Sequence, residues 1–181
     1  TLETDFVRYS IGEDGKNLHF IDKRTGQDFL DRKAAPAFAR IKIAGKEHLS
    51  SSVSAEVADR EKFLTVQFAE TDFQMQLRAV ENPHFITLTV DDVKEFPIEE
   101  LTFFDIALLP GSGPDPFAGC ALALNLQTNI PEVPQANTRL HALCYPRFGL
   151  QGAQAALIGC PQSQLRPIMQ KVVAQADGLP H

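Results

Sequence analysis

The sequence predicts an all-β protein, an antiparallel β-sandwich with one short C-terminal α-helix, mainly because three successive segments alternate in polarity. Apolar and polar residues alternate along 62–69, 72–80 and 84–93. Successive side chains of a strand point to opposite faces, so this period is typical of half-buried antiparallel strands. Short polar turns, Glu70-Thr71 and Glu81-Asn82-Pro83, connect the three segments. About ten such short segments with frequent turn signals favour a sandwich.

The N-terminal residues predict a β-hairpin followed by two more strands. Strands are expected at 5–11 and 17–22, joined by Gly12-Glu13-Asp14-Gly15, whose glycines accept a positive φ at little cost. Further strands are expected at 37–43 and 52–57, directly before the alternating segments. In the last of these, three residues are expected to share one face: Val53, Ala55 and Val57.

The strand predicted at 98–109 differs from the others because apolar residues occupy both of its parities, which is typical of a strand covered on both sides. Two sets are expected on opposite faces: Leu101 and Phe103 on one, and Phe104, Ile106 and Leu108 on the other. Three more strands are expected at 120–127, 138–144 and 155–158. In the first of these, three residues are expected to point inward: Leu122, Leu124 and Leu126.

Two long loops interrupt this pattern. The stretches 110–119 and 128–137 are rich in Pro, Gly and Asn. The favoured interpretation is that they only cross between two sheets. Long loops on a rigid sheet are also common places for function, and this alternative stays open.

The chain ends in a predicted helix over 167–176, with Pro167 in its first turn and Gly178 as a stop signal. Three apolar residues form a stripe along it, and we expect their burial to depend partly on a neighbouring domain: Ile168, Val172 and Val173. The inward parities of the strands predict one contiguous core. Its expected members are Leu64, Phe68, Phe73, Met75, Leu77, Ile86, Leu88, Val90, Phe104 and Ile106.

The length and charge of the chain argue against several classes of function. The 181 residues fit one sandwich domain at 1–160, followed at 161–181 by a helix or linker that belongs to it or connects to a missing catalytic domain. A formal charge of −6 without a basic cluster argues against a nucleic-acid partner. No apolar run approaches the ~20 residues that span a bilayer, so no membrane partner is expected. We expect a soluble protein, and the sequence leaves its compartment open, whether secreted, periplasmic or other.

Motifs for metals and cofactors are missing from the sequence. Cys120, Cys144 and Cys160 are widely spaced and have no His at ligand spacing, so three free thiols are favoured over a zinc site or disulfide framework. Gly111-Ser112-Gly113 lacks the third glycine and the following helix of a dinucleotide-binding loop. We therefore expect no metal and no cofactor.

Two titratable residues stand out. His141 follows a polar loop that carries Glu132, and a sugar epimerase needs a His acid and a carboxylate base. No motif surrounds this pair, which favours an ordinary strand-end His. Asp105 lies inside an apolar strand, where an unpaired carboxylate is costly. The favoured interpretation is that Arg or backbone N–H groups pair it, and the alternative is that it points into a pocket.

One segment combines the residue types that bind sugars. Aromatic rings pack on the apolar faces of pyranoses, and Arg and amide groups bind hydroxyls. The chain has no Trp and two Tyr, which weakens the prediction of a dedicated glycan-binding module. An ordinary turn between strands is the favoured interpretation of this segment. The candidate ligand-binding residues are Tyr145, Arg147, Phe148, Asn129, Asn137 and His141.

The order of these segments resembles the N-terminal β-sandwich domains, related to the galactose-mutarotase fold, that precede the catalytic barrel of many glycoside hydrolases. The resemblance spans roughly 5–145 and is carried by four segments. These are Phe38–Gly45 (FARIKIAG), Ser52–Phe68 (SVSAEVADREKFLTVQF), Phe73–Val90 (FQMQLRAVENPHFITLTV) and Glu100–Leu109 (ELTFFDIALL).

This resemblance implies a non-catalytic accessory domain of a carbohydrate-active enzyme. Its partner would be a catalytic barrel of the same polypeptide, its contact with carbohydrate would be weak or indirect, and it would have no catalytic residue of its own. An independent carbohydrate-binding module and a mutarotase-like sugar epimerase stay open as the second and third interpretations.

Overall fold

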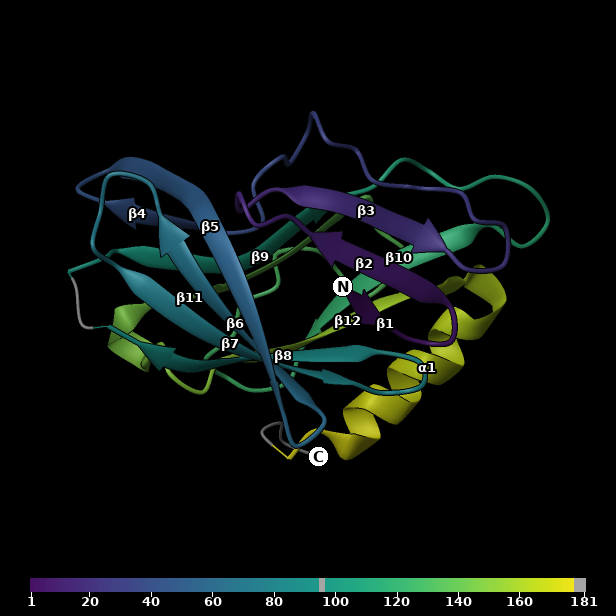
Figure 1. The fold of residues 1–181 in the computed structure, drawn as a ribbon. Helices are drawn as coiled ribbons and strands as arrows, with labels where there is room; N and C mark the ends of the chain where they lie inside the picture. Colours follow the sequence, from purple (N-terminus) through teal and green to yellow (C-terminus); the bar gives the residue numbers. More distant parts are fainter. Residues whose placement is uncertain (95–96, 178–181) are drawn as a thin grey trace.

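The computed structural model describes residues 1–94 and 97–177, and this part of the chain is an antiparallel β-sandwich with one α-helix, as predicted (Figure 1). The strands are β1 (Leu2–Glu3), β2 (Val7–Ile11), β3 (Asn17–Asp22), β4 (Arg40–Ile43), β5 (Lys46–Ala58), β6 (Glu61–Phe68), β7 (Gln74–Glu81), β8 (Ile86–Val93), β9 (Glu100–Ala107), β10 (Phe117–Ala123), β11 (Arg139–Cys144) and β12 (Gln154–Pro161). A 3-10 helix, η1 (Pro146–Phe148), precedes β12, and α1 (Gln162–Gln175) follows it.

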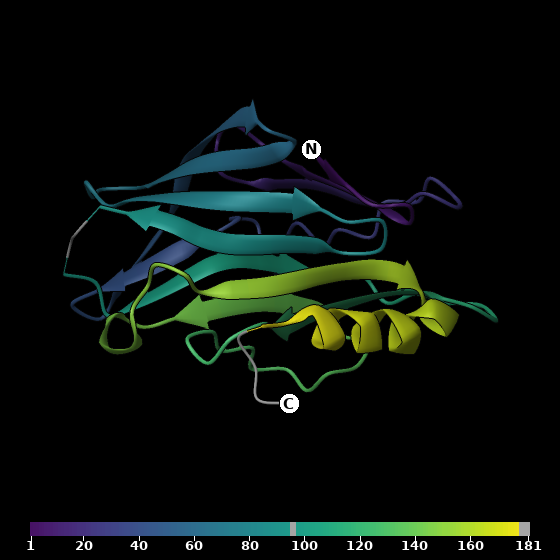
Figure 2. The same cartoon turned by 90° about the horizontal axis from the view of Figure 1, so that it is seen from below.

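Nine strands form one large sheet in the order β10-β12-β8-β7-β6-β5-β4-β9-β11. The sheet curves until its two end strands approach each other, and a single bridge between Gly119 and Asn137 links β10 to the loop before β11. The curvature is visible in Figures 1 and 2, and it leaves one inner face and one outer face.

The small sheet β1-β2-β3 forms the second layer (Figure 1). Its inward residues Val7, Tyr9 and Phe20 belong to the same buried cluster as the inner face of the large sheet. The ring of Phe20 lies 5.9 Å from that of Phe117 on β10, in an edge-to-face arrangement that aromatic pairs favour. The predicted N-terminal hairpin is therefore confirmed and closes one side of the core.

The predicted core is confirmed. All ten expected residues belong to one buried cluster, and none of them is more than 5% exposed. The strand alternation that predicted these residues also assigns the opposite parity of β7 and β8 to the outer face of the large sheet.

Several predicted strand boundaries need correction. The strand expected at 37–43 begins only at Arg40, and the one expected at 52–57 is the much longer β5. The expectation that Val53, Ala55 and Val57 share one face is confirmed, since they occupy alternate positions of β5 in an unshifted register with β6. Only Val53 of the three is buried, and Val57 is 71% exposed because the end of β5 extends beyond the core. The strand expected at 120–127 is β10, which begins three residues earlier and ends at Ala123. Leu126 lies beyond that end and is 80% exposed.

A β-bulge at Phe103 changes the predicted alternation of β9. Ala142 of β11 lies opposite Phe104 and Leu143 lies opposite Thr102, so Phe103 has no partner on that strand. A bulge of this kind shifts the alternation by one residue. Asp105 therefore shares the outer face with Thr102, and the expected strict parities of 98–109 are wrong at this point. The expected coverage of both sides is confirmed, since residues 101–107 are all buried.

The C-terminal helix begins five residues earlier than predicted, and Pro167 is its sixth residue instead of lying in its first turn. Asp115 of a distant loop accepts hydrogen bonds from the backbone N and the Oγ of Ser163, at 2.9 and 2.8 Å, and so caps the first turn. The pKa of Asp115 is lowered, chiefly by these bonds. Gly178 lies outside the described residues.

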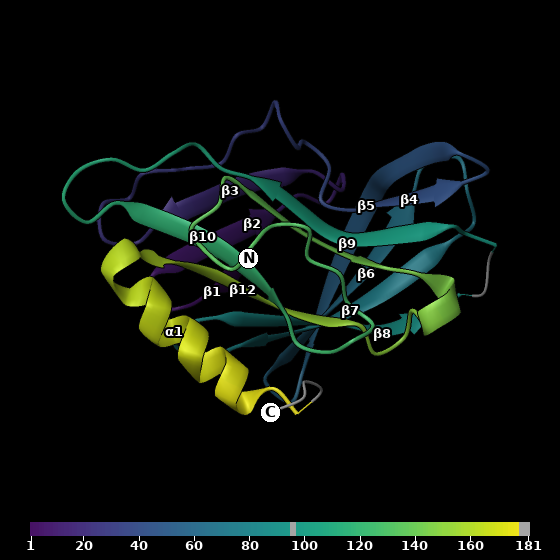
Figure 3. The ribbon, with the colours of Figure 1, turned by 180° about the vertical axis from the view of Figure 1, so that it is seen from behind.

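The helix packs on the outer side of β12 and β10, as Figures 2 and 3 show. Ile168 and Val172 are each 1% exposed, and the sandwich of the same chain covers them. The expectation that burial of the stripe depends partly on a neighbouring domain is therefore wrong for Ile168 and Val172. Val173, the third residue of the stripe, is 46% exposed. Within 1–94 and 97–177 no helix combines the length and hydropathy that crossing a membrane requires.

All three cysteines are free, as predicted, and all three are buried. Burial raises the pKa of the Cys144 thiol to about 12 and that of Cys160 to about 12. Deprotonated thiols are the reactive form, so these groups behave as small apolar side chains at neutral pH.

Candidate functional site

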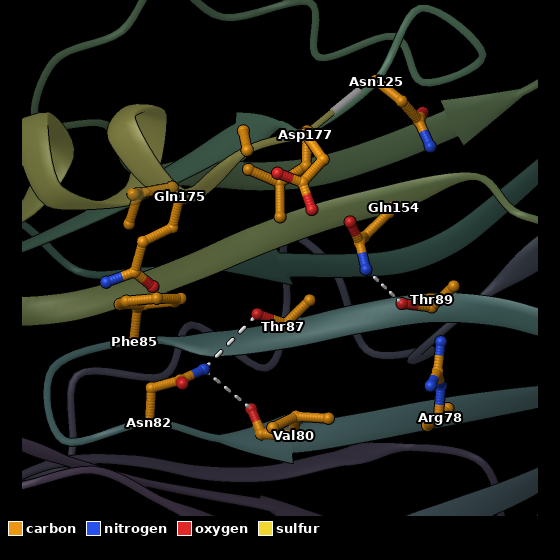
Figure 4. A pocket seen from close by; sticks show the side chains of 13 residues that line it. Arg78, Val80, Asn82, Phe85, Thr87, Thr89, Asn125, Gln154, Gln175 and Asp177 are labelled. Carbon is orange, nitrogen blue, oxygen red and sulfur yellow. Dashed lines mark hydrogen bonds between the residues drawn. The ribbon is translucent and has the colours of Figure 1, made fainter. Parts of the chain in front are cut away.

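A polar groove of about 450 Å³ lies on the outer face of β7, β8 and β12, beside the C-terminal end of α1 (Figure 4). The helix covers β10 and β12 but leaves β7 and β8 open, so its end forms a wall above an uncovered part of the sheet. The groove is thus made by the same docking of α1 that buries Ile168 and Val172.

The floor of the groove consists of two rows of side chains, the first across three strands and the second across two. In the first row, Arg78, Thr89 and Gln154 lie opposite one another on β7, β8 and β12. In the second row, Val80 lies opposite Thr87. These residues occupy the outward parity of the alternating segments, which explains why polar groups gather there.

The walls come from segments that are distant in the sequence. Phe85 precedes β8 and is 7% exposed, so it offers the groove an apolar edge and not an open ring face. Gln175 projects from α1 toward Phe85, and Asp177 follows the helix (Figure 4). Asn125, which follows β10, lies at the opposite end of the groove.

Hydrogen bonds within the protein hold some of the lining side chains in place and leave other polar groups free to bind a ligand. Gln154 Nε2 donates to Thr89 Oγ1 at 2.8 Å (Figure 4). Asn125 Nδ2 donates to the carbonyl of Gly152 at 2.7 Å. Asn82 Nδ2 makes two long bonds of 3.4 Å, to Val80 O and Thr87 Oγ1. The floor is therefore held in place, while carbonyl oxygens of the amides remain able to accept further bonds.

The guanidinium group of Arg78 makes no hydrogen bond with any residue that the structure describes. Its guanidinium lies 3.8 Å from Glu61 and 3.8 Å from Asp91, which is too far for hydrogen bonds. Its Nε atom is buried and has no hydrogen-bond partner among the described residues. A buried donor without a partner costs free energy. The Arg78 side chain as a whole is 36% exposed, so its terminal N–H groups are available to a ligand acceptor in the groove.

The chemistry of the groove suits a neutral ligand with many hydroxyl groups. Among the groove-lining residues that the structure describes, only Arg78 and Asp177 are charged, and their charges are opposite. The other polar groups are amides and hydroxyls, which both donate and accept. Within the described ranges, no group of three or more His, Cys, Asp or Glu side chains is arranged to hold a metal ion.

The structure divides the predicted platform into separate pairs. Asn129 Nδ2 donates to the Tyr145 hydroxyl at 3.3 Å, so these two residues do lie together. The Arg147 guanidinium lies 4.5 Å above the ring of Phe148, which covers one face of that exposed ring. Arg147 and Phe148 lie in η1 and Tyr145 directly precedes it, whereas Asn129 comes from a separate segment that bridges to Leu143.

The other two predicted residues have different surroundings. Asn137 donates to the carbonyls of Val133 and Gln135 within its own loop. His141 Nδ1 lies 2.8 Å from Glu132 Oε1, but not in hydrogen-bond geometry, and Nδ1 lacks a partner within the described part of the chain. The loop does bring Glu132 to His141, but their direct contact leaves no room for a sugar ring between them.

The carboxylate of Asp105 is paired by two arginines, as the favoured interpretation expects, and Asp105 also lines a hollow, as the alternative expects. Arg139 donates from Nε to Oδ1 at 2.5 Å and from Nη2 to Oδ2 at 2.7 Å, and Arg40 Nη1 donates to Oδ2. The Asp105 side chain is 3% exposed, so this pairing supplies the compensation that burial requires.

The stability of the protein is expected to fall between about pH 7 and pH 5 because of His141. Burial lowers the pKa of His141, against the opposing effect of Glu132. The unfolded imidazole, with a pKa of about 6.5, then binds a proton at a higher pH than the folded one, so acid favours unfolding. Replacing His141→Gln should flatten the pH dependence of the unfolding free energy in this range, measured by urea denaturation. His84→Gln is the control, and an unchanged slope in the His141 variant would contradict the assignment.

No protein-family model matches the sequence, and no curated protein matches it. The geometry of the groove is therefore the main guide to function.

Proposed function

We propose that this chain is a non-catalytic accessory β-sandwich domain of a carbohydrate-active enzyme, and that glycan contacts it through the groove on β7, β8 and β12. The observation that carries this proposal is the combination in one groove of an unsatisfied Arg78, several amides and the apolar edge of Phe85. Amides, hydroxyls and an arginine are groups that bind sugar hydroxyls, and they lie here beside an apolar edge, at a place other than the Tyr145 segment.

A binding role is favoured over an acid/base role because the candidate acids and bases are engaged with each other. Both oxygens of Asp105 accept bonds from guanidinium groups, and Glu132 contacts His141 directly. A base that must take a proton from a sugar needs a free oxygen within reach of it. The groove itself contains one carboxylate, Asp177, and no His among its described residues.

Titration of the protein with neutral oligosaccharides, followed by calorimetry, tests this proposal. We expect weak binding, with a Kd for simple monosaccharides above about 1 mM, since few groups contact one sugar ring. Gln175→Ala should raise the Kd for the best oligosaccharide by about 3- to 10-fold, the effect of one lost hydrogen bond. This side chain makes no hydrogen bond among those described, so the fold should not change.

Gln170→Ala is the matched control, because Gln170 lies exposed on the same helix and does not line the groove. Equal affinities of the two variants, or no oligosaccharide binding at all, would contradict the proposal. Micromolar affinity of the isolated chain would favour an independent carbohydrate-binding module. Polarimetric acceleration of anomer exchange that His141→Gln abolishes would favour the mutarotase-like interpretation.

A further inference from the structure

A second hollow, of about 350 Å³, lies on the outer face of β4 and β9, away from the groove. Figure 3 shows β4 beside β9 on the side of the molecule seen from behind. The floor is formed by Arg40, Asp105 and Arg139, and the segment 34–37 forms one wall. Glu47 stands at the rim, and its side chain is 61% exposed.

The strands bring these groups together through the bulge at Phe103. The bulge turns Asp105 to the outer face, where it lies opposite His141 of β11. Arg40, the first residue of β4, lies opposite Thr102 on the same face. Thr102 is 1% exposed, and its hydroxyl has no hydrogen-bond partner within the described ranges.

The wall of the hollow is fixed from inside. Asn17 Nδ2 donates to the carbonyls of Ala35 at 3.0 Å and Asp105 at 2.8 Å, and its Oδ1 accepts from the hydroxyl of Tyr9. Asn17 is 3% exposed, so this network joins the wall, β9 and β2 beneath the surface. The hollow is therefore a preformed feature and needs little ordering when a ligand enters.

The charges of the hollow are unequally placed. Two guanidinium groups and one carboxylate lie at the floor, which leaves one positive charge there, while the negative charges of Glu132 and Glu47 act on Arg139 from outside the floor. The second carboxylate, Glu47, lies at the exposed rim with its Oε1 3.6 Å from Arg40 Nε, beyond hydrogen-bond distance. Each guanidinium has five N–H donors, and Asp105 uses only some of them.

We propose that this hollow binds the carboxylate of a small ligand, such as the uronate group of an acidic sugar, which displaces Glu47 and accepts bonds from Arg40 and Arg139. The planar fork of Arg matches a carboxylate, and the single positive charge of the floor matches its single negative charge. Phosphate shares the oxyanion chemistry but carries more charge than the floor can balance beside Glu47. The site is distinct from the groove and does not rest on the proposed function.

Calorimetric titration with galacturonate, with galactose as the neutral probe and inorganic phosphate as the other oxyanion, tests the inference. Galacturonate should bind, galactose and phosphate should bind at least about 10-fold more weakly, and added salt should weaken galacturonate binding. Glu47→Gln should lower the Kd for galacturonate by about 2- to 5-fold, because it removes a competing charge from an exposed rim. An unchanged or raised Kd in this variant, or equal binding of galactose, would overturn the inference.

Arg139→Gln should abolish galacturonate binding, and Arg147→Gln, at an exposed arginine on η1, should leave it unchanged. Thermal melting of each variant separates loss of the site from loss of the fold. The Glu47 variant tests the site without changing Asp105 or the two arginines that pair with it. Gln175→Ala should leave galacturonate binding unchanged. Galacturonate binding that depends on Gln175 would assign it to the groove and reject the second site, whatever the outcome for neutral glycans.

Discussion

Replacing Leu77→Ala should lower the free energy of unfolding by about 2–5 kcal/mol, as is usual when a buried Leu leaves a cavity. Leu77 is 0% exposed and belongs to the main core cluster, between β6 and β8 in the middle of the large sheet. Its neighbours are held by strand pairing on both sides, so they have little freedom to close the cavity. Urea denaturation measures the change.

Leu126→Ala is the matched control, because the same atoms are removed from a side chain that is 80% exposed. The effect should stay within about 0.5 kcal/mol of zero. Equal losses in the two variants would mean that the inner face of β7 is not the core described here.

The double variant Arg40→Gln with Arg139→Gln should lower the unfolding free energy at pH 7 by about 3–5 kcal/mol, because it leaves the buried carboxylate of Asp105 uncompensated. The Asp105 side chain is 3% exposed, and its carboxylate accepts hydrogen bonds from the guanidinium groups of both Arg40 and Arg139. Arg147→Gln, at an exposed arginine, should change stability by less than about 0.5 kcal/mol.

Adding Asp105→Asn to the double variant should restore a large part of the loss, because an amide is neutral and costs less to bury than an unpaired carboxylate. Equilibrium denaturation of the wild type, the double variant and the triple variant measures this recovery. A triple variant no more stable than the double variant would show that the arginines act through packing and not through the charge of Asp105.

The strands were predictable because their signal is local. The alternation along 62–93 determines which side chains of β6, β7 and β8 face inward, and the structure confirms those side chains in the core. The start of α1 was not predictable, because its cap is Asp115 from a loop far along the chain and not a residue beside Gln162. The bulge at Phe103 was missed for a similar reason, since register with β11 and not composition reveals it.

The groove illustrates why sites are harder to predict than strands. Its outward residues on β7 and β8 were implied by the alternation, but Gln154 and Gln175 join them only through the pairing of β12 with β8 and the docking of α1. No spacing in the sequence relates these positions. The one available signal was that polar residues on the outward parity, Arg78, Thr87 and Thr89, lie on neighbouring strands.

The order of strands in the large sheet has a consequence for how fast the chain can fold. The pairings from β5 to β8 join neighbours along the chain and cost little loop-closure entropy. The pairing of Ile41 on β4 with Leu101 on β9, and that of β12 with β8, close much longer segments. Contacts of high sequence separation slow folding. We therefore expect the β5–β8 meander to form early and the closure of the sheet around it to limit the overall folding rate.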